Sequence, residues 1–153
     1  MDARQAGGRI ERELLILNRH LEMTSPRRVR LDNNALDRSA YVLLSRLEAQ
    51  GPMSVPDLVD AFGLTPSTLT RQTTALLRDG LVERTLDPGG SIARQFRVTD
   101  EGRKRLHTDR DAITTGLTDV LGDWPEDRLR RFIEDLERFN TDIERRTGRP
   151  WPR

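Results

Sequence analysis

The chain has 153 residues and no cysteine, and its 26 Lys and Arg side chains are balanced by 25 Asp and Glu side chains. This length suits one domain or a small domain with an extension, and the lack of cysteine excludes disulfides, thiolate metal sites and thiol redox switches within the chain. Without a signal peptide or an apolar run of about 18 residues, we expect a cytoplasmic protein that makes no membrane contact.

The first predicted helix covers residues 9–24 and follows a polar, Gly-containing start at 1–8 that we expect to be flexible. Its apolar side chains recur at helical spacing, at Ile10, Leu14, Leu17 and Leu21. Leu15 and Ile16 widen this surface, so the helix needs apolar cover on more than one side. It packs either into a core or against a second copy of the chain, and a basic linker at 24–35 follows.

Two short helices follow the linker. Asp37 caps the first, which extends to about Gln50 and has its buried stripe at Ala40, Leu43, Leu44 and Leu47. Ser54 begins the second helix, with Asp57 near the positive end of the helix dipole. Gly63 then makes the turn into a third helix.

The third helix begins at Thr65, a good N-cap, with Pro66 in its first position, and ends near Gly80. Its narrow core stripe consists of Leu69, Thr73, Leu76 and Leu77. The opposite side has hydroxyl and guanidinium groups and no carboxylate, at Ser67, Thr70, Arg71, Thr74 and Arg78. Such a face suits phosphates and base edges, although an ordinary solvated helix face can have the same composition.

After Gly80 the pattern changes to two strands, at 81–86 and 91–98, joined by a DPGG turn. Three arginines lie on these strands: Arg84, Arg94 and Arg97. A two-stranded hairpin is marginal by itself, so it must pack on the helices. Two helices joined by a tight turn and followed by a hairpin form a winged helix-turn-helix, which places one helix in the DNA major groove.

Two long helices complete the chain. Thr99 caps the first, whose apolar side chains are Leu106, Ile113, Leu117 and Val120. The second starts after Pro125, and its apolar side chains are Leu129, Phe132, Ile133, Leu136, Phe139 and Ile143. These two helices and the first one have more apolar surface than the winged module can cover, which is typical of an oligomerisation layer.

We therefore predict a mainly helical α+β chain with a small β wing. The winged helix-turn-helix covers 36–100, residues 9–24 and 101–147 form the dimerisation helices, and 148–153 form a flexible end. The charge distribution favours a nucleic-acid partner, because 64–105 contain eight basic and five acidic side chains while the remainder of the chain is neutral or acidic.

The segments STLTRQTTALLRDGLVER at 67–84 and RVTDEGRK at 97–104 make the chain resemble the MarR (multiple-antibiotic-resistance regulator) family of bacterial transcription factors. The resemblance covers nearly the whole chain in the order and length of its elements. It implies a homodimer that binds a pseudo-palindromic site in double-stranded DNA without a cofactor. It also implies a small aromatic or anionic effector between the dimer layer and the reading unit, so we expect a ligand-responsive repressor.

By position, the resemblance assigns base reading to Ser67, Thr68, Thr70, Arg71 and Thr74, and the predicted DNA-binding set is completed by Arg78, Arg84, Arg94 and Arg97. It assigns the dimer contact to Ile10, Leu14, Leu17, Leu21, Leu129, Phe132, Ile133, Leu136 and Phe139. The wing departs from the family pattern, because residues 89–92 (GGSI) replace the usual tip arginine and leave Arg94 as a partial substitute. Ala75 replaces a longer side chain, which indicates a reduced or altered contact set.

Little in the sequence indicates an enzyme or a metal site. His20 and His107 are far apart on polar helix stretches, and GxGxxG and GxxxxGK loops are missing. The acidic pairs are expected on solvated helix faces without a catalytic partner, at Asp109/Asp111 and Glu134/Asp135.

Three aromatic side chains either line an effector cleft or, as we expect, pack in the core or at helix ends: Tyr41, Trp124 and Trp151. The competing functional class is a winged-helix module that binds protein instead of DNA. Such a module would need apolar or mixed-charge side chains on the outward face of 66–79, where this chain has Ser, Thr and Arg.

Overall fold

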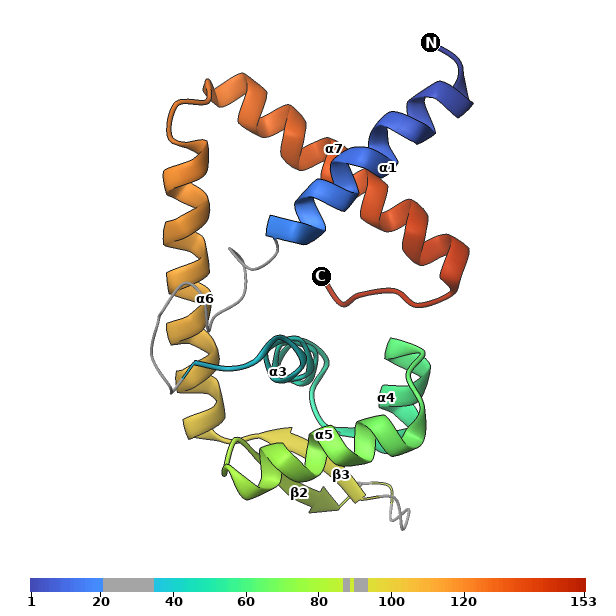
Figure 1. Ribbon diagram of the computed structural model, residues 1–153. Helices are drawn as coiled ribbons and strands as arrows, with labels where there is room; N and C mark the ends of the chain where they lie inside the picture. The colour runs from blue at the N-terminus through green and yellow to red at the C-terminus, as the bar shows by residue number, and fades with distance from the viewer. Residues whose placement is uncertain (21–34, 87–88, 90–93) are drawn as a thin grey trace.

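The computed structural model describes residues 1–20, 35–86, 89 and 94–153 (Figure 1). Its elements in chain order are α1 (Ala3–His20), α3 (Arg38–Gln50), β1 (Met53–Ser54), α4 (Val55–Phe62), α5 (Pro66–Arg78), β2 (Val82–Leu86), β3 (Arg94–Val98), α6 (Asp100–Leu121) and α7 (Glu126–Thr147). This confirms a mainly helical chain with a small β wing. The predictions for Leu21, the basic linker and most of the DPGG turn lie outside the described residues.

One hydrophobic core joins α3, α4, α5 and the sheet, and we call this group of elements the reading unit. The side chains at its centre are fully buried, among them Leu43, Leu44, Leu58, Leu69 and Leu81. The sheet has the strand order β1-β3-β2 with antiparallel pairs. The two-residue strand β1, in which Met53 pairs with Phe96 of β3, is not predicted from the sequence.

The helix caps lie where the sequence predicts them. The Asp37 carboxylate accepts a hydrogen bond from the Ala40 N–H at 2.8 Å. Ser54 and Asp57 form a reciprocal capping box at the start of α4. Gly63 has a φ of 64°, the left-handed conformation that ends α4. These local signals fix the lengths and directions of the helices that support α5.

The N-terminal helix starts at residue 3, six residues earlier than the predicted start at residue 9. Asp2 and Gln5 cap α1 reciprocally: the Gln5 N–H donates to Asp2 Oδ1 at 2.8 Å, and the Asp2 N–H donates to Gln5 Oε1 at 3.3 Å. This cap makes residues 3–8 helical, where we expected a flexible start. No helix among the described residues is long and apolar enough to cross a membrane.

The α6 helix connects the reading unit to a second layer made of α1 and α7 (Figure 1). Its first half packs on α3 and buries Leu106 completely. Asp109 is also buried, with 0% exposure, and accepts a hydrogen bond from the Leu36 N–H at 2.8 Å. The prediction of a solvated Asp109 is therefore wrong, because this carboxylate satisfies a buried amide. Asp111 and the Glu134/Asp135 pair are exposed, as predicted.

A polar cluster ties α6 to α3 beside this core. Glu48 accepts from Arg110 Nη2 at 2.8 Å, and its other oxygen lies 2.5 Å from His107 Nε2. Partial burial raises the pKa of Glu48, but hydrogen bonds from Arg110 and His107 outweigh it, so the pKa lies below its ordinary value. His107 is thus half exposed but has a partner, whereas His20 is simply exposed.

Candidate DNA-binding surface

The orientation of α5 is set by its cap and its core stripe. Thr65 Oγ1 accepts from the Thr68 N–H at 3.3 Å and lies 2.8 Å from Thr68 Oγ1, which fixes the first turn. Leu69, Thr73 and Leu76 are buried, and the Thr73 hydroxyl donates to the Leu69 carbonyl at 2.9 Å. With this side anchored in the core, the opposite side of α5 must face outward.

The outward face of α5 is polar and free of carboxylates. Its exposed side chains are those predicted to read DNA: Ser67, Thr70, Arg71, Thr74 and Arg78. Arg78 pairs with Asp79 at 3.1 Å, whereas Arg71 has no ion pair within the described part of the chain. Thr68 is half buried and held by the cap, so its hydroxyl is less accessible than those of Ser67 and Thr70.

Of the three wing arginines, two lie on one face of the sheet and the third lies on the other. Paired residues of antiparallel strands share a face, so the register puts Arg84 with Phe96 and Arg94 with Leu86 on the side of the core. Arg97 pairs with Glu83 on the other side, where its Nε and Nη2 atoms lie 2.9 and 2.5 Å from Glu83 Oε1. Arg84 and Arg94 are both exposed.

This arrangement predicts unequal roles for Arg84 and Arg97. If Arg84 contacts a phosphate, Arg84→Ala is expected to weaken binding to all DNA sequences alike and to lower the slope of log affinity against log salt by about 1. Arg97→Ala is expected to change the slope less, because Glu83 already neutralises its charge. Fluorescence anisotropy across a salt series measures both slopes, and a larger effect of Arg97→Ala would contradict this assignment.

The residues predicted for dimerisation cover one apolar surface of α1 and α7, and we call this surface the apolar layer. Neither helix has a buried residue, and Ile10 and Ile133 are 48% and 54% exposed. The exposed members in the described part are Ile10, Leu14, Leu17, Phe132, Ile133, Leu136 and Phe139, while Leu129 is half buried. Five of them, Ile10, Leu14, Leu17, Phe132 and Leu136, line a cavity of about 680 Å³ between α1 and α7.

The aromatic side chains pack at helix ends and on the core. Trp124, in the corner before α7, contacts Phe132 edge-on with a centroid distance of 5.4 Å, and the Arg128 guanidinium lies 4.9 Å from its centroid. Tyr41 is half buried against the core of the reading unit. Among the described residues, no group of three His, Cys, Asp or Glu side chains could hold a metal ion.

A second cavity of about 350 Å³ lies beside the outward face of α5. It is lined by the start of α3, one side of α5 and one residue of α6, including Ser39, Arg71, Gln72 and Arg105. The sequence does not predict this cavity, because its walls come from segments that are far apart in the chain. Arg71 belongs both to this cavity and to the predicted DNA-reading face.

The model of the MarR family matches residues 36–89, which include α3, α4, α5 and β2. An uncharacterized HTH-type transcriptional regulator, YxaD of Bacillus subtilis, is 34% identical over 105 residues, which are 69% of this chain and 73% of that protein. A MarR family protein from Bacillus stearothermophilus has a similar fold, with a TM-score of 0.81 and 20% identity over 94% of this chain and 99% of its own.

A similar fold is also found in BpsR of Bordetella bronchiseptica, with a TM-score of 0.64 and 18% identity over 86% of this chain and 91% of that chain. Its structure describes the regulation of DNA binding by 6-hydroxynicotinic acid. The matches to these three proteins cover 69%, 94% and 86% of this chain, so they extend well beyond a single motif.

Proposed function

The chain belongs to the MarR family of transcriptional regulators, and from this premise we propose that it is a ligand-responsive repressor that binds a pseudo-palindromic operator as a homodimer. DNA binding and the regulation of transcription follow from the family. The homodimer, the effector, the sign of regulation and the individual contact residues are the parts that we propose.

The composition of the outward face of α5 supports DNA reading by the side chains on that face. It presents exposed hydroxyl and guanidinium groups on a helix whose other side is fixed in the core. Arginine can bind guanine edges in a bidentate manner, and Ser and Thr can bond to several bases or to phosphates. A protein-binding module would need apolar or mixed-charge side chains on this face, so the family and the surface both favour DNA.

The apolar layer supports the homodimer. Its side chains come from both ends of the chain and remain exposed in a single copy. Contiguous apolar surface of this kind marks an interaction site, and a second copy would cover it with the same surface around a two-fold axis. A symmetric dimer presents two α5 helices to one duplex, and such readers bind two half-sites one helical turn apart.

The cavity beside α5 supports an effector that competes with DNA. A molecule bound among Ser39, Arg71 and Gln72 would occupy space next to the predicted reading face. It would hold the Arg71 side chain away from a base edge, which gives a direct route from ligand binding to DNA release. BpsR, whose DNA binding responds to a small aromatic acid, is a precedent for an effector of this size on this fold.

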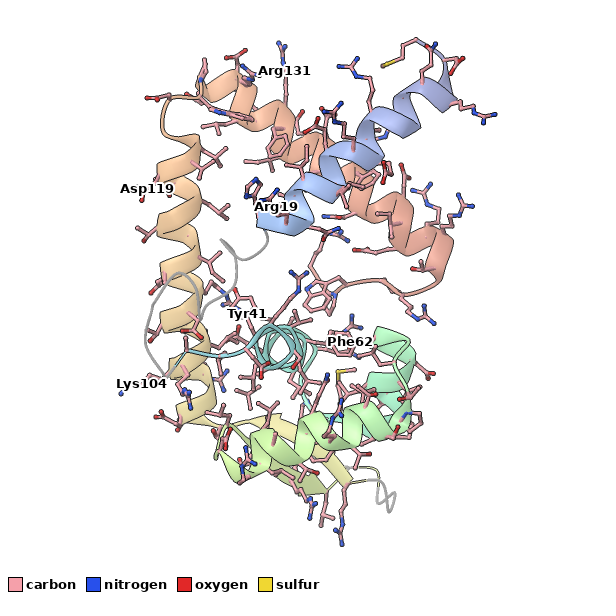
Figure 2. All side chains as sticks on the ribbon, in the orientation of Figure 1. Arg19, Tyr41, Phe62, Lys104, Asp119 and Arg131 are labelled. Carbon is pink, nitrogen blue, oxygen red and sulfur yellow. The ribbon has the colours of Figure 1, made fainter. Side chains whose placement is uncertain are left out.

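Replacing Arg71 tests the base-reading assignment. Arg71→Ala is expected to weaken binding to the operator by about 1–3 kcal/mol and to relax its preference for one base pair. Binding to scrambled DNA should change only slightly. The matched control is Arg131→Ala, which removes the same charge at the start of α7, far from α5 (Figure 2). If Arg71→Ala discriminates operator from scrambled DNA as well as the wild type does, Arg71 does not read bases.

A further inference from the structure

The segment that follows α7 turns back toward the reading unit, and the C-terminus lies between α7 and α3 (Figure 1). We call residues 149–153 the tail. Trp151 contacts Phe62 of α4 edge-on, with ring centroids 6.3 Å apart and an angle of 60° between the rings. Figure 2 shows Phe62 on the reading unit, below the end of the chain. The tail thus places an aromatic ring on an element that belongs to the DNA-binding core.

Arg46 of α3 is the second anchor of the tail. Its guanidinium lies 5.2 Å from the centroid of the Trp151 ring, a cation–π arrangement. Its Nη1 atom donates to the Pro150 carbonyl at 2.9 Å, and its Nε atom donates to Gln50 Oε1 at 2.8 Å. Arg46 is only 7% exposed, so the tail covers a charged side chain that would otherwise be a surface group.

The tail is also fixed to α7, from which it comes. Arg153 binds Glu144 in a bidentate manner, with Nη1 and Nη2 at 2.8 and 2.9 Å from the two carboxylate oxygens. The Arg149 guanidinium lies over Gly63, where an added Cβ would come within 2.5 Å of its central carbon. The tail therefore has contacts at both of its ends and in its middle, where we expected a flexible terminus.

These contacts hold α3 from two opposite sides. Glu48 bonds to His107 and Arg110 of α6, and Arg46, two residues earlier, bonds to the tail. Two residues correspond to about 200° of helix rotation, so the two attachments lie on opposite faces of α3. Through α6, α7 and the tail, the chain forms a closed circuit that attaches the reading unit on both sides of α3, whereas α6 alone would leave it attached at one side only.

We propose that the tail is a positioning element for DNA reading, in which Trp151 and Arg46 fasten the reading unit to α7. The inference rests on the homodimer proposed above, because the angle of each reading unit on its helical frame sets the distance between the two α5 helices. Neighbouring base pairs are about 3.4 Å apart along the duplex. A loosely attached reading unit would therefore tolerate operators of different half-site spacing but would bind the correct one less tightly.

The first test measures binding to a set of operators whose half-site spacing is changed by one or two base pairs in either direction. Trp151→Ala is expected to weaken binding at the best spacing about tenfold and to flatten the dependence on spacing. Trp151→Phe keeps a ring against Phe62 and should restore most of the wild-type profile. The control is Arg145→Ala in the last turn of α7, whose ion pair is with Asp142 of the same helix. Sedimentation should show unchanged dimers for all variants.

The second test needs neither DNA nor a known operator. The chain has no native cysteine, so spin labels at Asp60→Cys in α4 and Glu134→Cys in α7 report the distance between the reading unit and the frame. Dilution with unlabelled chain isolates the distance within one chain. Trp151→Ala should broaden this distance distribution, and Trp151→Phe should not.

The two tests distinguish a failure of the tail proposal from a failure of the proposed function on which it rests. A flattened spacing profile together with a broadened distance distribution supports the proposal. Unchanged spacing dependence in Trp151→Ala, or an unchanged distance distribution, overturns it. If the wild-type chain itself does not discriminate operators, the proposed function fails, and the spin-label distances alone decide whether the tail fastens the reading unit.

Discussion

We expect Leu136→Glu to leave the chain folded but to convert the proposed dimers into monomers. Leu136 lies in the middle of α7, in the apolar layer, and is 46% exposed in a single chain. The substitution therefore removes little from the fold of one copy. In a dimer it places a carboxylate of each copy in an apolar interface, and an unpaired buried charge costs several kcal/mol. We expect the dissociation constant of the dimer to rise by a factor of about 1,000, which corresponds to ~4 kcal/mol.

The affinity for operator DNA gives a second, independent test of Leu136→Glu. A monomer has one α5 helix and reads a single half-site, so its affinity for the full operator should approach its affinity for non-specific DNA, a loss of about 1,000-fold or more. Analytical ultracentrifugation and anisotropy measured on the same sample test the two consequences together. Circular dichroism checks that the helices remain.

The control for this substitution is Arg138→Glu, which introduces the same side chain two positions further along α7. Arg138 is exposed, and two residues correspond to about 200° of helix rotation, so its side chain points away from the apolar layer. It should leave the dimer intact. Monomers formed by the unmodified chain at micromolar concentration, or dimers that persist in Leu136→Glu, would contradict the assignment of α1 and α7 to the interface.

Gly102→Ala is expected to have the largest effect on stability. Gly102 is buried in the first turn of α6, and an added Cβ would lie 2.1 Å from the Leu81 carbonyl oxygen and 3.0 Å from Val98 Cγ1. The Leu81 carbonyl cannot move easily, because it accepts a hydrogen bond from the Thr99 N–H at 3.1 Å. Overpacking against backbone of this kind costs about 1–3 kcal/mol or more, so the melting temperature should fall by roughly 5–10 °C.

Gly116→Ala in the same helix is expected to change the stability in the opposite direction. Apart from its chain neighbours and the backbone of α6 itself, no described atom lies within 4 Å of a Cβ added there, and alanine is about 1 kcal/mol more favourable than glycine inside a helix. Gly116→Ala should therefore raise the melting temperature by a few degrees. Calorimetry on both variants compares one chemical change at two positions of α6. A stable Gly102→Ala protein would show that the junction of α5, β2 and α6 can relax.

The parts of the fold that the sequence predicts are those with local signals. Thr65 and Pro66 mark the start of α5, Ser54 and Asp57 form the cap of α4, and a φ of 64° at Gly63 ends that helix. Each of these depends on residues within four positions of one another, where cap chemistry and helical periodicity act. The exposed set on α5 follows in the same way, because the buried stripe determines which side faces outward.

The parts that the sequence does not predict depend on contacts between distant segments. Asp109 is buried because it bonds to the amide of Leu36, 73 residues earlier. The β1 strand has only two residues, too few for a pattern, and exists because it pairs with β3. Trp151 packs on Phe62 across most of the chain length. The unequal roles that we predict for Arg84 and Arg97 likewise depend on strand register, which places Glu83 opposite Arg97.

The most direct test of the central claim is a titration of the purified chain onto the DNA just upstream of its own gene, with scrambled DNA of the same length and composition beside it, across a salt series. We expect binding of two chains per operator duplex, with at least 1,000-fold preference over scrambled DNA and an affinity that falls steeply with salt. Equal and weak binding to both duplexes would contradict sequence-specific reading by α5.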